Sequence, residues 1–143
     1  MVHTLSEIER VLAPDGILID LRPILDRWHI QVTSARETRQ AGRMQDFDIG
    51  LADDEAANRA AREAEANRWF TRESEEFFPL IYSWDSASEM EEWIEDEWHD
   101  FMGLSQETKH AARSAWALGD GDTRVRVDIK MLITRWRKLQ PLS

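Results

Sequence analysis

The chain has 143 residues, of which 42% are hydrophobic and 32% charged, with no cysteine and a formal net charge of −10. This length and balance are typical of a single domain over residues 1–143, and the lack of cysteine excludes disulfides, thiolate metal sites and a cysteine nucleophile. No apolar run has the length of a membrane span, the start lacks a signal-peptide pattern, and a chain this acidic repels phosphates; we therefore expect a cytoplasmic protein with no membrane and no nucleic acid as partner.

The first predicted element is a short amphipathic helix. Leu5, Ile8 and Leu12 recur at the spacing of one helix face, with polar residues between them. Ser6 is the expected N-cap, because a serine hydroxyl accepts hydrogen bonds from the free N–H groups of a first turn. The turn Pro14–Gly16 ends the helix, which we expect to finish near Leu12.

Three strands are predicted next. The continuous apolar run Ile17–Leu21 is typical of a strand that is buried on both faces. Pro23 stops this strand, because proline has no N–H to offer a strand ladder. The stretches Ile30–Ala35 and Gly42–Ile49 predict a weaker pair of strands.

A long helix and an aromatic strand occupy the middle of the chain. The helix is predicted from Asp53 to about Thr71. Alanines repeat along one of its faces and leave that face smooth enough to approach a sheet closely: Ala56, Ala57, Ala60, Ala61 and Ala64. A strand rich in aromatic and branched residues is predicted at Phe77–Trp84, and Pro79 places this strand at a sheet edge or a bulge.

Two capped helices and one regular strand complete the chain. Ser86 and Glu89 have the spacing of a capping box, Ser105 caps the following helix, and Gly119 ends it. The stretch Val125–Thr134 alternates apolar and polar residues, which predicts a strand with one buried face. The order of elements indicates an α+β fold: a mixed, largely antiparallel sheet of about five strands with helices packed on it.

The segment Leu5–Asp20, which reads LSEIERVLAPDGILID, resembles a segment of class I S-adenosylmethionine (SAM) methyltransferases. In that family a helix ending in R-x-L-x-P-G-G leads into the fifth strand of a Rossmann-like sheet. Asp15 here stands in place of the first glycine of the pair. The resemblance implies the C-terminal half of such a Rossmann-like fold, in which two further strands follow and the last is antiparallel.

The same resemblance implies that the cofactor-binding half is missing. The family holds SAM with a glycine-rich loop after its first strand and an acidic residue at the end of its second, and both would precede Met1. Gly119 and Gly121 follow a predicted helix rather than a strand, so they do not replace that loop. We therefore expect a methyltransferase-like fragment without a cofactor of its own, to which SAM binds only if an upstream half or a partner is present.

The strand Ile17–Leu21 then has an open edge, and such an edge pairs readily with another chain. We expect a homodimer, or a partner chain, that covers this strand. The charge distribution agrees with self-association: residues 123–143 carry six Lys/Arg and one Asp, although the whole chain is strongly acidic.

Four residues are predicted to bind substrate. Asp20 and Arg22 stand at the carboxyl end of a strand, where α/β sheets place ligands, and the plain structural alternative for them is an ion pair. Trp84 and Asp85 stand beside a predicted turn. Trp84 is one of seven tryptophans, which either fill a core and an interface or line a ligand pocket. No residue is assigned a catalytic, cofactor-binding or metal-binding role.

Two other functions stay open at this point. One is a small-molecule binding module with a Trp-lined cavity between the sheet and the helices, and the other is a SAM-dependent methyltransferase truncated at its start. A metal site is the weakest interpretation. It would use Asp96 with His99 and Glu107 with His110, pairs with the i, i+3 spacing found in di-metal helix bundles, but a solvated helix face explains both pairs more simply.

Overall fold

The computed structural model describes residues 1–142, and in that part of the chain it has four α-helices and seven strands. The helices are α1 (Val2–Val11), α2 (Asp48–Ala66), α3 (Ala87–Trp93) and α4 (Gln106–Ala117), and a π-helical turn at Ile94–Trp98 continues α3. The strands are β1 (Ile17–Pro23), β2 (His29–Thr33), β3 (Thr38–Arg43), β4 (Gln45–Asp46), β5 (Phe70–Trp84), β6 (Met102–Gly103) and β7 (Arg124–Lys138).

The strands form one open five-stranded sheet and one two-stranded sheet. In the larger sheet the order is β1-β7-β2-β3, and β5 pairs with β7. β1 and β2 pair antiparallel with successive stretches of β7, residues 131–137 and 124–128 respectively, and β3 is antiparallel to β2. β4 and β6 form the small sheet. The prediction of an α+β fold with a largely antiparallel sheet is confirmed.

Contacts along the chain separate it into two units, each described here by itself. Unit 1 contains residues 1–24, residues 52–78 and the chain from Met131 onward; unit 2 contains residues 25–51 and 79–130. Strands β5 and β7 contribute residues to both units. That residues 1–143 form a single domain stays a prediction.

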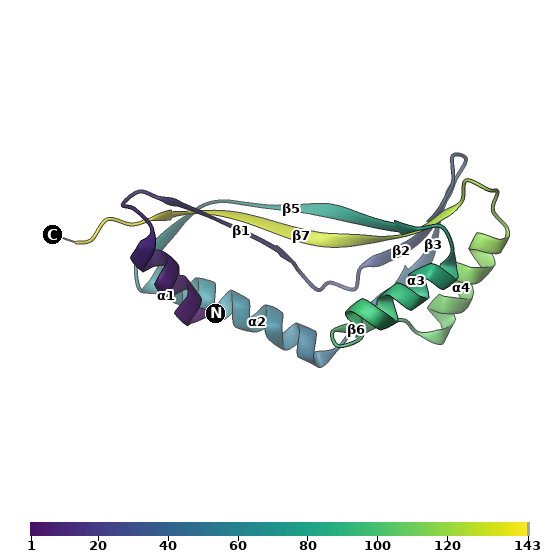
Figure 1. Cartoon of the computed structure of the whole chain (residues 1–143), viewed down its shortest axis with the longest axis horizontal. Coiled ribbons are helices and arrows are strands. Elements are labelled where there is room, and N and C mark those ends of the chain that lie inside the picture. The colour runs from purple at the N-terminus through teal and green to yellow at the C-terminus, as the bar shows by residue number, and fades with distance from the viewer. Residues whose placement is uncertain (143) are drawn as a thin grey trace. The chain divides into compact units, whose positions relative to one another are not determined.

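Unit 1 has its core where two helices meet the sheet. α1 and α2 lie on the same side of β1 and β7 (Figure 1). The buried cluster joins the alanine face of α2 to aromatic side chains of the strands: Ala61, Ala64, Phe70 and Trp136. Three half-buried residues of the first helix and its end pack against this cluster: Leu5, Ile8 and Leu12. The small alanine side chains let α2 approach the sheet closely, as their spacing predicts.

Unit 2 is built on the β2–β3 hairpin, with α4 packed against both strands and α3 beside α4 (Figure 1). Both predicted caps are present. The Ser86 hydroxyl accepts a hydrogen bond from the Glu89 N–H at 3.1 Å, and the Ser105 hydroxyl accepts one from the Thr108 N–H, also at 3.1 Å. Each cap satisfies a donor that the first turn of its helix leaves free.

Two predicted helix ends were wrong: the start of α1 and the C-terminal end of α2. α1 begins at Val2 with Met1 at its N-cap position, so Ser6 lies within the helix. α2 ends at Ala66, although the pattern predicts helix to about Thr71. Its end is a Schellman motif: Arg68 takes a left-handed conformation (φ 59°), and the Trp69 N–H donates to the Ala64 carbonyl at 3.0 Å. Because this position is not a glycine, the sequence carries no clear signal that the helix ends here.

The second strand of the hairpin was also placed wrongly. The stretch Gly42–Ile49 was predicted as a strand, but β3 is Thr38–Arg43 and α2 begins at Asp48. The Leu51 N–H donates to the Phe47 carbonyl at 3.1 Å and closes the first helical turn despite the glycine within it. The sequence pattern does not predict β3 because most of its side chains are polar and exposed, so it lacks the apolar alternation of a half-buried strand.

The burial of β1 and β7 also differs from the prediction. β1 is not buried on both faces: Ile17, Ile19 and Leu21 are exposed, and only the alternate side chains face the helices. The alternation in Val125–Thr134 predicts that the odd-numbered residues, Ile133 included, form the buried face of β7. They are buried up to Met131, but beyond it Ile133 is only half-buried and Thr134 is buried instead. The reason is that the even-numbered residues of this stretch lie opposite the inward side chains of β1 and under the helices of unit 1.

Candidate functional site

A cleft opens in unit 1 on the face of β1 that the helices cover. Its apolar part has a volume of about 310 Å³ and lies among α1, α2 and the strands. Six of the apolar side chains that line it come from five elements, α1, β1, α2, β5 and the C-terminal end of β7: Leu5, Ile8, Leu18, Ala57, Phe70 and Trp136. The cleft therefore has the size and the apolar lining of a small-molecule site.

A second, more polar hollow of about 360 Å³ adjoins the apolar part, and we call this hollow the polar part of the cleft. Asp20, Arg22, Ala61 and Trp136 line both parts. The polar part adds Asn58 and Arg62 from α2, Arg72 and Glu75 from β5, and Thr134 from β7. Strand register explains this grouping, because Asp20 is paired with Thr134 and Arg22 with Leu132, so these side chains share one face of the sheet.

Arg22 is the best-buried charged group of the cleft. Its side chain is 17% exposed, and its Nη2 donates a hydrogen bond to Asn58 Oδ1 at 3.0 Å. Its Nε lies 3.5 Å from Asp20 Oδ2, an ionic contact without hydrogen-bond geometry. Nε and Nη1 are both buried and have no hydrogen-bond partner among the described residues. Since buried N–H groups are normally satisfied, this guanidinium stands out because the described residues leave two of its nitrogens without an acceptor.

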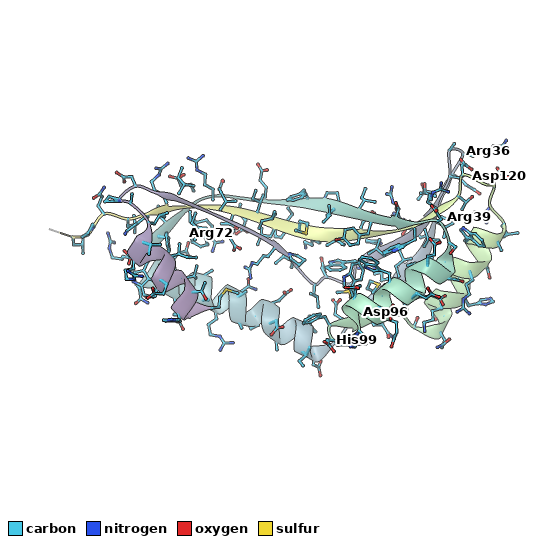
Figure 2. The ribbon with its side chains drawn as sticks, in the orientation of Figure 1. Arg36, Arg39, Arg72, Asp96, His99 and Asp120 are labelled. Atoms are coloured by element: carbon cyan, nitrogen blue, oxygen red, sulfur yellow. The ribbon has the colours of Figure 1, made fainter. Side chains whose placement is uncertain are left out.

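Arg72 forms the wall of the cleft opposite β1 and is labelled in Figure 2. Its guanidinium carbon lies 4.8 Å from the centre of the Trp136 ring, a cation–π contact. It also donates to Glu75 at 2.6 Å and lies 3.5 Å from Glu65. These partners hold Arg72 in place, so it shapes the cleft more than it offers free donors.

The four residues predicted to bind substrate do not form one site within either unit. Asp20 and Arg22 lie together in the cleft of unit 1, as predicted from their positions on one strand. Trp84 and Asp85 belong to unit 2. Sequence reasoning missed Asn58, Arg72 and Trp136 as members of the cleft, and only the alanine spacing around Asn58 gave any signal for them.

Trp84 lies in a cluster of aromatic rings. Its ring centre is 6.2 Å from that of Tyr82, 6.4 Å from that of Trp93 and 6.3 Å from that of Trp98. The Asp85 carboxylate pairs with Arg124 at 3.0 Å. These rings pack on one another, whereas the cleft of unit 1 contains one tryptophan, so the expected Trp-lined cavity is not the cavity that the geometry favours.

Several charged groups outside the cleft have structural partners within the described chain. Asp96 lies in the π-helical turn and His99 directly follows it (Figure 2), and His99 Nε2 lies 3.1 Å from Asp100 Oδ1. No three His, Asp or Glu side chains within residues 1–142 gather as metal ligands would. A hydrogen bond from Arg137 lowers the pKa of Glu73, and one from Lys130 lowers the pKa of Asp26.

No protein-family model, curated protein or solved structure matches the chain. Among the described residues, no helix combines the length and apolar character that crossing a membrane requires. The resemblance to class I methyltransferases therefore stays a prediction carried by the Leu5–Asp20 segment.

Proposed function

We propose that this chain is a methyltransferase-like part of a fold, which does not hold SAM alone and completes its sheet along β1 with a second polypeptide. The observation that carries the proposal is the open, apolar strand β1. In the described chain β1 pairs with β7 alone, and Ile17, Ile19 and Leu21 are 41%, 52% and 55% exposed. An edge strand of this kind is a ready template for pairing with another chain.

The arrangement around β1 supports the family part of the proposal. The helix, the tight turn and the strand follow one another as the resembling segment predicts, with α1 at Val2–Val11 and β1 at Ile17–Pro23. Asp15 takes a left-handed conformation (φ 61°), which suits a position where the family has glycine. The last strand of the chain, β7, is antiparallel to β1, as the resemblance implies.

The position of Asp20 and Arg22 supports a role for the cleft on the acceptor side. Both lie in the second half of β1 and face the space between this strand and α2. Ligands of open α/β sheets bind beyond the carboxyl ends of their strands. Asp20 and Arg22 would then contact the molecule that receives the methyl group, while SAM would be held by the second polypeptide.

Sedimentation velocity and calorimetric titration test this proposal together. We expect the purified chain to associate at tens of micromolar, and we expect no heat of binding with SAM or S-adenosylhomocysteine from the chain alone. The proposal would be refuted by a chain that stays monomeric over this range and that gains no SAM-dependent methyltransferase activity when a polypeptide carrying a cofactor-binding half is added. Tight binding of SAM by the chain alone would show that its cofactor site is complete. The interpretation of the chain as a methyltransferase-like part without the cofactor-binding half would then be wrong.

A second candidate, a small-molecule binding module, is favoured by the cleft itself. The cleft joins an apolar part of about 310 Å³ to a polar part of about 360 Å³ through four shared residues. This function needs neither SAM nor a second polypeptide. A ligand that binds the isolated chain in a cleft-dependent way would support it whatever the result of the SAM titration.

A further inference from the structure

We infer that the cleft of unit 1 binds a small organic monocarboxylate with an apolar body, and that Arg22 is the residue that holds the carboxylate. This inference rests on the second candidate function, the cleft as a ligand site, and does not require methyl transfer. It follows from three features of the cleft: the unused donors of Arg22, the charges around them and the apolar space beside them.

The unused donors come first. Arg22 has five N–H groups in principle, and within residues 1–142 the only hydrogen bond of its side chain runs from Nη2 to Asn58 Oδ1. A buried donor without a partner costs stability, and this cost is recovered when an acceptor enters the site. A carboxylate oxygen that reaches the Arg22 guanidinium, whose side chain is 17% exposed, forms a charge-assisted hydrogen bond, which is stronger than one between neutral groups.

The charged side chains that line the polar part favour a ligand with a single negative charge. Arg62 and Arg72 also line this part, but Arg62 is held by Glu55 at 3.0 Å and Arg72 by Glu75 at 2.6 Å. Asp20 lines the same space beside Arg22, and its carboxylate repels added negative charge. A monocarboxylate is therefore tolerated next to Arg22, whereas a doubly charged phosphate is repelled more strongly and is disfavoured.

The apolar part supplies the rest of the ligand's binding energy. Arg22 and Trp136 line both parts of the cleft, so a carboxylate at Arg22 directs the body of its ligand along the Trp136 ring toward α1. Leu5, Ile8 and Phe70 line that end. Burial of an alkyl or aryl body there removes apolar surface of ligand and protein from water together.

Calorimetric titration of the full chain with octanoate, octanol and octyl phosphate tests the inference. We expect octanoate to bind at least about tenfold more tightly than either of the others, because only it matches both the donors and the charge. Arg22→Gln should weaken octanoate binding about thirtyfold and leave octanol within about twofold of the parent. The matched control is Arg10→Gln, a side chain 68% exposed on α1 and paired with Glu7, which should change neither ligand.

The outcomes separate cleanly. Equal affinity for octanoate and octanol, tighter binding of octyl phosphate, or an unchanged octanoate affinity in Arg22→Gln would each overturn the assignment. If circular dichroism shows that Arg22→Gln does not fold, the comparison of the three ligands on the parent chain decides alone. None of these results depends on SAM, so a failed carboxylate site and a failed methyltransferase-like function are distinguishable.

Discussion

The exposed face of β1 allows the proposed association to be tested by a change that leaves the core alone. Ile17, Ile19 and Leu21 alternate along the strand and are exposed, whereas the residues between them are half-buried. Replacing all three with threonine keeps side chains that suit a strand, while it removes most of the apolar surface that a partner would cover.

The magnitude follows from the exposed fractions. Complete burial of an Ile or Leu side chain is worth about 1.5–3 kcal/mol, and these three side chains are 41–55% exposed in the isolated chain. Covering the remainder is therefore worth about 1 kcal/mol for each residue, or about 3 kcal/mol for the three. At about 1.4 kcal/mol per tenfold change, the triple variant should raise the dissociation constant by about a hundredfold.

Sedimentation velocity over a dilution series measures this constant. The control variant carries Val11→Thr and Leu118→Thr, two substitutions at side chains that are 67% and 75% exposed but do not lie on β1. We expect the control to associate as the parent does. Equal dissociation constants for the parent and the triple variant would refute the reasoning, because the association surface would then lie elsewhere.

Two further predictions concern the stability of unit 1. Phe70→Ala should lower the free energy of unfolding by about 3–5 kcal/mol, because Phe70 is 2% exposed in the core cluster, whereas Phe77→Ala, at a side chain 55% exposed, should lower it by less than about 1 kcal/mol; urea titration compares them. The hydrogen bond from Arg137 holds the pKa of Glu73 below its ordinary value of 4.5, so the pair stabilises the fold above that value and the contribution is lost as the pH falls through the lowered pKa. Glu73→Gln should therefore be less stable than the parent at neutral pH and equal to it in strong acid, and a difference that persists in acid would contradict the pH argument.

Local features of this protein were readable from the sequence because they depend on neighbours along the chain. The caps at Ser86 and Ser105 formed as predicted, since a hydroxyl needs only the N–H three residues later. The alanine stripe of α2 and the turn after α1 are likewise set by spacing within a few residues. The edge position predicted for the strand containing Pro79 agrees with the pairing of β5 to β7 alone within the described chain.

Long-range partners decided what the sequence did not. Charged residues at the start of β5 lie in a strand that pairs with β7, and there Glu73 meets Arg135 and Arg137, more than sixty residues away. No local pattern predicts this, and the same residues continue the helical pattern of α2.

The cleft shows the same division between local and long-range information. Asp20 and Arg22 were recognisable because they stand at one strand end, a local property. Asn58 and Trp136 join them only through the packing of α2 and β7 on β1, which also buries Nε and Nη1 of Arg22. Sequence determined which chemical groups the chain carries and where its local elements start, whereas burial and partnership, which depend on contacts between distant segments, were decided by the tertiary structure.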